Sequence, residues 1–446
     1  MTIVHFVHFR HTKRVHNARF SVPSDQAESG FGDRDAAAII GSRGQEAPVV
    51  ERQANSNESR LKGRAPATVC GVGAVTAYGW GRQKLWDGLA SGESAVVRST
   101  GWADTLGHDV AYMGRISNEP HTDPRSRYAR AIEAAVDEAI TDATARGWKR
   151  GRTVGLISAI ALGEVDAWRE FYMERDRQLT KREYLQLMPS TILSEQMQRN
   201  DFHGPAMAVT AMCASGNAAM LTAKMWLDAG VVDDVIVVAT DISGTTDNIR
   251  HFVDLGVLFV DRPPFEACRP FQEGSLGFLL GEASVAFVVS RQDEPAYLKV
   301  LGGAMSHDGF HVTSINPAFT DVQRCFELAL ADAGVDGNDV KYLNAHGPGT
   351  LQCDAAEAAM LDLLLEEAEG IFSVKPLTGH CQAASSAVEI AASCLAFETG
   401  TITAPRSVSP GHPRLLSGIT PRKPGIMLKS SIGMGGHNSV IVLDDM

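Results

Sequence analysis

Residues 209–220, VTAMCASGNAAM, place Cys213 between an apolar run and a series of very small residues. The apolar run predicts a short strand, and residues 214–230 predict a helix that Gly230 closes. A cysteine at a helix N-terminus lies in the field of the helix dipole, which favours a thiolate. We therefore interpret Cys213 as a candidate nucleophile, although a cysteine taken at random is more often a buried structural thiol.

Two histidines each follow an apolar stretch and lie beside a glycine. His346 follows the predicted strand 340–345, and His380 follows residues 371–374 with a short turn between them. A lone histidine in such a place is more often a satisfied polar residue than a catalyst. Two of them together with Cys213 are typical of nucleophilic catalysis by cysteine. Zinc is not expected, because the spacing fits no standard ligand pattern and no acid completes the set.

The elements that must position these residues alternate between strands and helices. Further strands are predicted over 67–79, 153–163, 233–244, 426–432 and 439–443, and further helices over 127–146 and 382–397. The strand-helix-strand unit around Cys213 implies a parallel sheet. An α/β chain of this kind predicts layered sheets covered by helices, with ligands beyond the carboxyl ends of the strands.

The bulk composition narrows the class of protein. The chain has 446 residues, of which 44% are hydrophobic and 21% charged, as in an ordinary globular enzyme. Its net charge of -12 disfavours nucleic acid and anionic membranes as partners. No apolar run is long enough for a membrane span. The seven cysteines are scattered without a Cys-x-x-Cys pair, which favours a reducing, cytoplasmic compartment over a disulfide framework.

The N-terminal residues differ from the rest of the chain. Residues 1–24 are basic and rich in histidine, and residues 25–65 are polar without periodicity. An organelle presequence or a metal-binding tract would share some of these features. We expect residues 1–65 to form a disordered extension, because they lack the apolar pattern of a packed core.

Five segments, taken in order, resemble the β-ketoacyl-acyl carrier protein synthases of the thiolase superfamily. TAMCASG is similar to the nucleophile motif of that family, and NAHGPGT is similar to its Glu-Ala-His-Gly-Thr-Gly-Thr motif. KPLTGH resembles Lys-x-x-x-Gly-His, and SSIGMGGHN resembles Asn-Ser-Phe-Gly-Phe-Gly-Gly-Thr-Asn. RPFQEGSLGFLLGEASVAFVV is similar to the Arg-Pro-Phe-Asp segment between them. The resemblance covers about residues 67–446.

This resemblance implies a duplicated, thiolase-like α/β/α/β/α fold. The N-terminal half would span residues 66–292 and carry Cys213, and the C-terminal half would span 293–446 and carry both histidines. Cys213 would accept an acyl chain, and a malonyl group would then lose carbon dioxide and condense with it. His346 and His380 would assist the decarboxylation and stabilise the enolate. No intrinsic cofactor is implied, because phosphopantetheine arrives on the acyl carrier protein.

The resemblance also assigns supporting roles. The backbone amides of Cys213 and Met434 would form the oxyanion hole. Lys375 would pair with Glu357 in an ion pair that holds the loops. The residues expected to bind pantetheine are Pro348, Thr350, Gly435 and Gly436. The residues that would dock an acidic carrier protein are Arg125, Arg127 and Arg130, for which a solvated helix face is the alternative.

Several residues depart from the family motifs. Pro348 replaces a threonine whose hydroxyl would contact pantetheine, at a cost of about 1 kcal/mol. Met434 replaces a phenylalanine that gates the acyl pocket, and methionine is slimmer and more flexible. The remaining departures are Asn344, His437 and the pair Ser385 and Ser386. TLQCDAAE, residues 350–357, resembles the corresponding run of type II polyketide ketosynthases. We therefore expect a role in polyketide, polyene or specialised fatty-acid synthesis.

Two alternatives remain beside a condensing enzyme. One is a non-condensing subunit, such as a chain-length factor, although such partners usually lack the cysteine that this chain keeps. The other is an acyltransferase or hydrolase that uses Cys213 without decarboxylation. A thiolase would need a second cysteine near the C-terminus, and residues 426–446 have none. The implied partners are acyl- and malonyl-loaded carrier proteins and a second chain, in a homodimer or a heterodimer with a related ketosynthase-fold chain.

Overall fold

The structure is a computed structural model that describes residues 65–107, 109–117, 125–173, 178, 180–292 and 296–445. The extension expected over residues 1–65 lies outside these ranges, apart from its last residue. All seven cysteines are described and free, as the sequence predicts. Among the helices in these ranges, none combines the length and the apolar character needed to cross a membrane.

Five strands of the first half form one set. They are β1 (Ala67–Thr76), β5 (Val154–Ala159), β6 (Ala206–Val209), β7 (Asp234–Asp241) and β8 (Ala283–Ser290). Their spatial order is β6-β5-β7-β8-β1. β5 runs parallel to both β6 and β7, whereas β8 runs antiparallel to both β7 and β1. The predicted strand-helix-strand unit is confirmed as parallel, with β5 between its two strands.

Five strands of the second half repeat this arrangement. They are β9 (Leu298–His307), β10 (Val340–Asn344), β11 (Gly370–Phe372), β14 (Ile426–Gly433) and β15 (His437–Asp444). Their order, β11-β10-β14-β15-β9, and their strand directions match the first half strand for strand. The expected duplication is therefore visible in the topology, whereas the boundaries of the halves at 66–292 and 293–446 stay a prediction. A short antiparallel contact of β1 with β9 joins the two sets.

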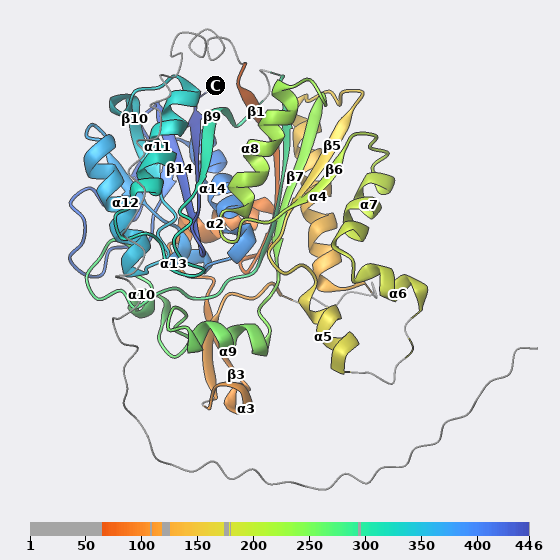
Figure 1. Ribbon diagram of the computed structural model, residues 1–446, viewed down its shortest axis with the longest axis horizontal. Helices are drawn as coiled ribbons and strands as arrows, with labels where there is room; N and C mark the ends of the chain where they lie inside the picture. Colours follow the sequence, from red (N-terminus) through yellow and green to blue (C-terminus); the bar gives the residue numbers. More distant parts are fainter. Residues whose placement is uncertain are drawn as a thin grey trace, which may run out of the picture. The chain divides into compact units, whose positions relative to one another are not determined.

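Helices form three layers around the two sets of strands (Figure 1). α4 (Arg127–Arg146) and α7 (Pro189–Arg199) cover the first set from outside. α11 (Thr320–Ala333) and α12 (Leu351–Leu364) cover the second. α8 (Ser215–Asp228) and α14 (Ser385–Thr399) lie between the sets and contact strands of both. This is the α/β/α/β/α layering that the sequence predicts.

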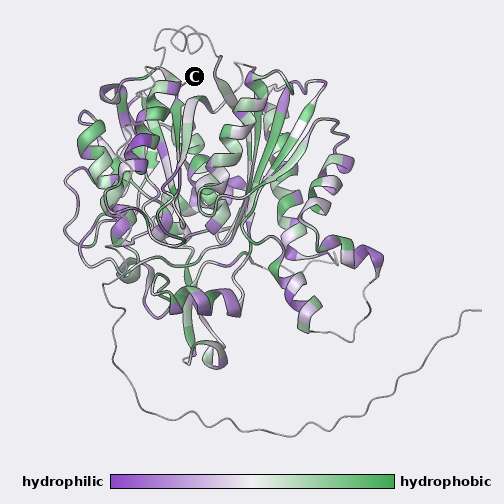
Figure 2. Cartoon of the chain, viewed as in Figure 1, coloured by the Kyte–Doolittle hydropathy of each residue, from purple (hydrophilic) through white to green (hydrophobic). Residues whose placement is uncertain are grey.

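The hydropathy of the elements follows these layers. Figure 2 shows hydrophobic residues concentrated in the strands and hydrophilic ones on outer helices such as α9. The remaining elements are β2 (Gly79–Trp80), α2 (Arg82–Ser91), β3 (Val97–Thr100), α3 (Ala103–Leu106), β4 (Val110–Met113), α5 (Val165–Met173), α6 (Lys181–Gln186), α9 (Thr246–Asp254), α10 (Pro264–Ala267), η2 (Gly337–Asp339), α13 (Lys375–Thr378), η3 (Gln382–Ala384), β12 (Thr401–Thr403) and β13 (Ile419–Pro421).

The predicted helices lie close to the observed ones. The helix predicted over 127–146 is α4, residue for residue. The helix after Cys213 ends at Asp228, and Gly230 follows with a left-handed φ of 66°. The helix predicted over 382–397 begins as the short helix η3 and continues as α14 from Ser385. These helices fix where the candidate site lies, because Cys213 and His380 come directly before α8 and the η3–α14 segment.

Candidate active site

Cys213 lies in a tight turn between β6 and α8. The residue before it, Met212, has a φ of 51°, a left-handed conformation that a non-glycine residue adopts only where its surroundings enforce it. Ser215 enforces it here, since its hydroxyl accepts a hydrogen bond from the Ala211 amide at 2.8 Å and donates one to the Met212 carbonyl at 2.6 Å. The turn places the Cys213 side chain at the cavity wall with 7% of the residue exposed.

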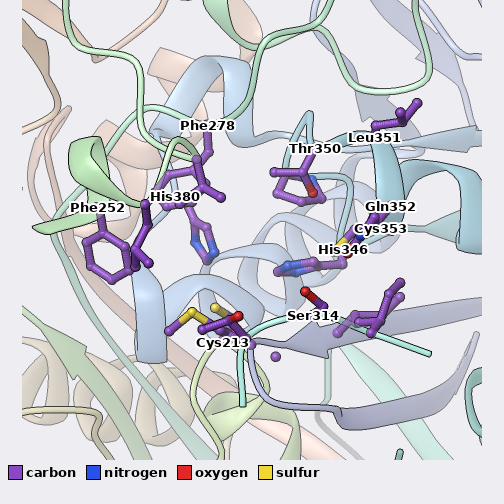
Figure 3. Close-up of a pocket in the computed structure, with 18 of the residues that line it drawn as sticks. Cys213, Phe252, Phe278, Ser314, His346, Thr350, Leu351, Gln352, Cys353 and His380 are labelled. Carbon is purple, nitrogen blue, oxygen red and sulfur yellow. The ribbon is translucent and has the colours of Figure 1, made fainter. Parts of the chain in front are cut away.

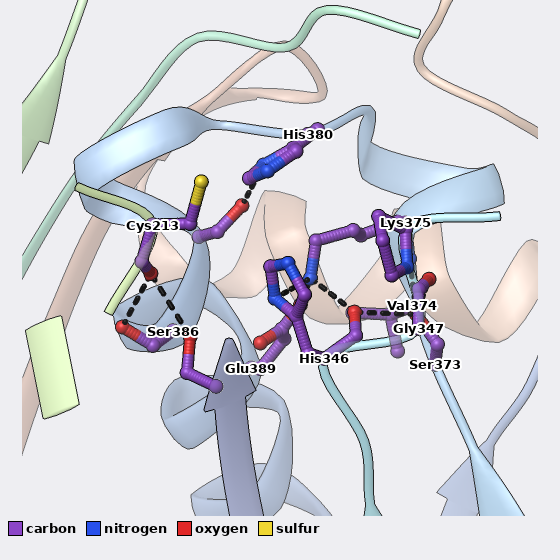
Figure 4. Close-up of polar contacts among 12 residues, drawn as sticks. Cys213, His346, Gly347, Ser373, Val374, Lys375, His380, Ser386 and Glu389 are labelled. Carbon is purple, nitrogen blue, oxygen red and sulfur yellow. Dashed lines mark hydrogen bonds and ion pairs between the residues drawn. The ribbon is translucent and has the colours of Figure 1, made fainter. Parts of the chain in front are cut away.

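The two halves meet directly behind this turn. Gly216 allows the contact, because a Cβ there would lie 2.6 Å from the Ser386 hydroxyl of α14. Ser386 accepts a hydrogen bond from the Asn217 amide at 3.0 Å. The hydroxyls of Ser386 and Ser431 both donate to the Cys213 carbonyl, at 3.5 and 3.0 Å (Figure 4). The nucleophile turn is therefore held by residues of the second half.

His346 is held in place by hydrogen bonds with Glu357 and Lys375. Glu357 of α12 accepts hydrogen bonds from the backbone amides of His346 and Gly347, at 2.6 and 2.8 Å. The Lys375 ammonium donates to the His346 carbonyl and lies 3.3 Å from its Nδ1 (Figure 4). Because an ammonium can only donate, Nδ1 accepts, and the ring proton of the neutral imidazole is on Nε2.

His380 is fixed in a similar way. Its Nδ1 accepts a hydrogen bond from the Gln382 backbone amide at 3.2 Å and lies 2.7 Å from the Ser385 hydroxyl. A backbone amide can only donate, so the proton of this imidazole is also on Nε2. The Phe278 ring packs edge-on against His380, with 4.9 Å between the ring centroids. Both histidines thus keep one N–H for a ligand in the cavity.

The structure brings the three candidate catalytic residues together. The sulfur of Cys213 and one ring nitrogen each of His346 and His380 all lie within 4.8 Å of one another. The centroids of the two imidazoles are 5.3 Å apart. They line a cavity of about 490 Å³ that Figure 3 shows from within. The wall also includes Phe252, Leu255, Val257, Leu276, Phe278, Ile315, Pro348, Thr350, Cys353, Gln382, Ile432 and Met434.

Burial controls the protonation of these residues. It raises the pKa of the Cys213 thiol to about 11, although the Met434 amide and the Lys375 charge lower it. The thiolate expected from the helix N-terminus is therefore corrected to a resting thiol, because desolvation outweighs the favourable field. Burial, followed by the charge of Lys375, holds the pKa values of His346 and His380 well below 6.5. Both imidazoles are neutral at physiological pH.

The same protonation pattern bears on metal binding. A zinc ligand must offer a nitrogen lone pair, and the lone pairs of both histidines lie on Nδ1, where Lys375 and the Gln382 amide occupy them. The Nε2 atoms of both neutral imidazoles then carry the protons. The Cys213, His346 and His380 cluster is thus arranged to donate hydrogen bonds to an oxygen atom.

The expected ion pair of Lys375 with Glu357 is wrong. The ammonium of Lys375 pairs with Glu389 of α14, and the same carboxylate pairs with Lys429 of β14 at 2.7 Å. All three side chains are at most 1% exposed. Glu357 instead binds the backbone of the His346 turn, because α12 directs its carboxylate towards those amides.

The sequence holds a signal for these missed residues. Glu389 interrupts an otherwise small and apolar helix, SSAVEIAASCLAF, and Lys429 interrupts the apolar strand IMLKSSIG. A charge in a segment predicted to be buried indicates a buried partner. In the sequence, Ser385 is visible only as a departure from the family motif, whereas in the structure its hydroxyl contacts His380. Gln382, which lines the cavity, was missed altogether.

The residues expected at the oxyanion hole and the pantetheine site divide into two groups. Pro348, Thr350 and Met434 line the cavity. The Met434 backbone amide faces the Cys213 sulfur and lowers the pKa of that thiol, although burial outweighs it. Gly435 and Gly436 are not among the residues that line the cavity, and their role in binding pantetheine stays a prediction. They form the turn between β14 and β15, where φ values of 86° and 89° favour glycine.

The three arginines expected to dock a carrier protein all make contacts within the chain. Arg127 forms an ion pair with the fully buried Glu282. Arg125 pairs with Glu133, and the Arg130 guanidinium lies 5.9 Å from the Trp80 ring centroid. Docking by these three arginines stays a prediction.

Comparison with known families matches most of the chain. Residues 65–294 match the family described as "Beta-ketoacyl synthase, N-terminal domain", and residues 297–409 match its "C-terminal domain". A curated relative, 3-oxoacyl-[acyl-carrier-protein] synthase 2 of Staphylococcus aureus, is 26% identical over 84% of this chain and 99% of its own length. The tetracenomycin polyketide synthase ketoacyl synthase alpha subunit of Streptomyces glaucescens is 26% identical over 84% of this chain and 96% of its own.

Solved structures share the fold at lower identity. One is described as a type II PKS acyl-carrier protein in complex with its ketosynthase bound to the hexaketide. The match has a TM-score of 0.75 at 22% identity, and it covers 86% of this chain and 100% of the other. The layered architecture of this chain is thus that of known ketosynthases.

Proposed function

We propose that this chain, which belongs to the beta-ketoacyl synthase family of condensing enzymes, catalyses the decarboxylative Claisen condensation of an acyl group on Cys213 with a malonyl group on an acyl carrier protein. One observation carries the proposal. The Cys213 sulfur and both histidines meet within 4.8 Å in one cavity, and both imidazoles offer an N–H rather than a lone pair.

The first step is acyl transfer. The Cys213 sulfur attacks the carbonyl of the acyl thioester, the pantetheine thiol leaves, and the proton of Cys213 passes to that thiol. The backbone amides of Cys213 and Met434 bind the oxyanion of the tetrahedral intermediate. Both lower the pKa of the thiol, which fits two N–H groups directed at the reacting sulfur.

The second step is decarboxylation of the malonyl thioester. The bond to the carboxylate breaks, carbon dioxide leaves, and its electron pair moves to the thioester as an enolate. The Nε2–H groups of His346 and His380 donate hydrogen bonds to the enolate oxygen, which offsets its charge where water is excluded. The enolate carbon then attacks the acyl-Cys213 carbonyl. A carbon–carbon bond forms, and the Cys213 thiolate leaves and takes up a proton.

Lys375 supports this chemistry from behind His346. Its ammonium fixes the Nδ1 atom of His346 as an acceptor, and Glu389 holds the ammonium in place. Lys375 and Glu389 therefore have positioning roles, because His346 and its turn lie between them and the cavity. Pro348 and Thr350 line the cavity, as expected for residues that contact the pantetheine arm.

We assign the enzyme to type II polyketide, polyene or specialised fatty-acid synthesis. The TLQCDAAE run and the two relatives named above, a polyketide synthase subunit and a 3-oxoacyl-[acyl-carrier-protein] synthase, support this range. The partners are acyl- and malonyl-loaded carrier proteins and a second copy or a related chain. Phosphopantetheine enters with the carrier protein.

Intact mass spectrometry tests the proposal. The full chain is incubated with an acyl-carrier protein, then with malonyl-carrier protein, beside Cys213→Ala and the matched variant Cys353→Ala. Cys353 is a second thiol in the same cavity. We expect the acyl mass on the wild type and on Cys353→Ala but not on Cys213→Ala. A β-ketoacyl product on the carrier should follow for the two proteins that are acylated. Acylation without this product would favour an acyltransferase, and no acylation would favour a non-condensing subunit.

A further inference from the structure

Gln382 carries a buried side-chain amide whose nitrogen faces no acceptor among the described residues. The residue is 5% exposed and lines the same cavity as Cys213 and His380. Within the part of the chain that the structure describes, its Nε2 makes no hydrogen bond. Buried donors are nearly always satisfied in folded proteins, so this open donor on a cavity wall is available to an acceptor on a molecule that enters the cavity.

The backbone holds this side chain in place. Gln382 has a φ of 45°, a left-handed conformation that is unfavourable for a residue with a side chain. Its own amide donates to the Nδ1 atom of His380 at 3.2 Å, and the next amide, that of Ala383, donates to Asp241 at 3.4 Å. Strain of this kind persists where the surroundings enforce it, and it gathers at ligand sites.

The position in the cavity identifies the part of the substrate that Gln382 meets. Leu351 and Gln352 are exposed and mark the mouth, with Leu351 86% exposed. Gln382 is buried and marks the interior. A carrier-bound thioester enters from the mouth, so its pantetheine arm occupies the outer part and its acyl chain the inner part. The wall near the interior includes Phe278 and Met434, which suit an acyl chain but leave the amide unsatisfied.

We propose that the Gln382 amide donates a hydrogen bond to an oxygen atom on the acyl chain, so that the enzyme selects β-ketoacyl or β-hydroxyacyl groups over saturated alkyl groups. This inference rests on the proposed function, because the chain must first be transferred to Cys213. The expected selectivity follows from the cost of leaving a buried donor without an acceptor. A site built to hydrogen-bond a substrate oxygen disfavours the analogue that lacks it, since the donor is then left unpaired.

The test compares acyl groups of equal length. Acetoacetyl-pantetheine and butyryl-pantetheine are offered separately, and the rate of Cys213 acylation is followed by intact mass. We expect the wild type to favour acetoacetyl by about tenfold in kcat/KM, as one lost hydrogen bond to a buried donor implies. Gln382→Leu should remove this preference and react with butyryl at least as fast as the wild type. The matched control is Gln352→Leu, the same change at the exposed mouth, which should keep the preference.

The outcomes separate this inference from the proposed function. Equal rates for the two thioesters in the wild type, or an unchanged preference in Gln382→Leu, would overturn the role of Gln382 while leaving acylation of Cys213 intact. Failure of the folded wild type to accept either group would overturn the proposed acyl transfer, and this inference with it. A fall of both rates by the same factor in Gln382→Leu would show a role in placing His380 instead, and would also overturn the selectivity.

Discussion

Glu389 is the shared anion of two buried lysines, and its replacement by glutamine should destabilise the fold. The Lys429 ammonium lies 2.7 Å from Oε2 of Glu389, and Lys375 contacts the other carboxylate oxygen. With an effective dielectric constant of about 20, one pair at this distance is worth about 6 kcal/mol of Coulomb attraction. Breaking a buried pair by removing one partner costs about 3–5 kcal/mol. We expect Glu389→Gln to lose this amount of unfolding free energy.

Urea denaturation followed by tryptophan fluorescence measures this loss. The matched control is Glu369→Gln, because Glu369 pairs with Lys423 on the surface, where both side chains are well exposed. The control should keep the wild-type denaturation midpoint. A loss below about 1 kcal/mol for Glu389→Gln, with an unchanged denaturant slope, would refute the reasoning, since it would mean that the two lysines do not depend on this carboxylate.

The pH dependence of the Glu389→Gln variant supplies a second check. Burial lowers the pKa of Lys429, and Glu389 partly restores it. Without Glu389, this pKa falls further below its unfolded value of about 10.5. The unfolded chain then binds more protons than the folded one, so the stability of the variant rises with pH. The gap between variant and wild type should narrow from pH 7 to pH 9. A constant gap would contradict this assignment of charge.

Three further predictions concern the reacting groups. Because burial raises the pKa of Cys213 to about 11, its alkylation by iodoacetamide should accelerate about tenfold per pH unit from pH 7 to 10, and a plateau near pH 9 would argue against a buried thiol. Burial holds the pKa values of His346 and His380 well below 6.5. The rate at which Cys213→Ala releases carbon dioxide from a malonyl thioester should therefore change by less than about twofold between pH 8 and pH 6. A steep fall of this rate towards acid pH would count against neutral imidazoles. Ser385→Ala removes a contact of 2.7 Å to His380 and should slow this decarboxylation about fivefold, as a loss of about 1 kcal/mol implies, and an unchanged rate would exclude a positioning role.

Local patterns predicted the elements and the meeting of three residues. The apolar spacing of residues 127–146 defines α4, because a helix on the outside of a sheet needs one apolar face. Cys213 and His346 each come at the end of a strand, and His380 at the start of a helix. Such turns gather at one edge of a parallel sheet. The sequence therefore predicts which residues share the cavity.

Long-range geometry decided what the sequence left open. The sequence offers Lys375 two possible ion-pair partners, a glutamate on α12 and another on α14. Only the packing of these helices decides that Glu389 is the partner. The expectation that the helix N-terminus favours a Cys213 thiolate is corrected for a similar reason. The helix N-terminus is visible in the sequence, whereas the depth of burial that raises the thiol pKa depends on α14 and β14 of the other half.

Duplication explains why the site lies where the halves meet. In each half, the helix between the third and fourth strands lies in the central layer, and these helices are α8 and α14. Cys213 comes directly before α8, and His380 comes directly before the η3–α14 segment, so the two residues occupy equivalent places. The close approach at Gly216 brings these places together. The second half then adds the turns after β10 and β14, which carry His346 and Met434. One half alone would hold either the nucleophile or the two histidines, and only their contact brings together the groups that the proposed condensation needs.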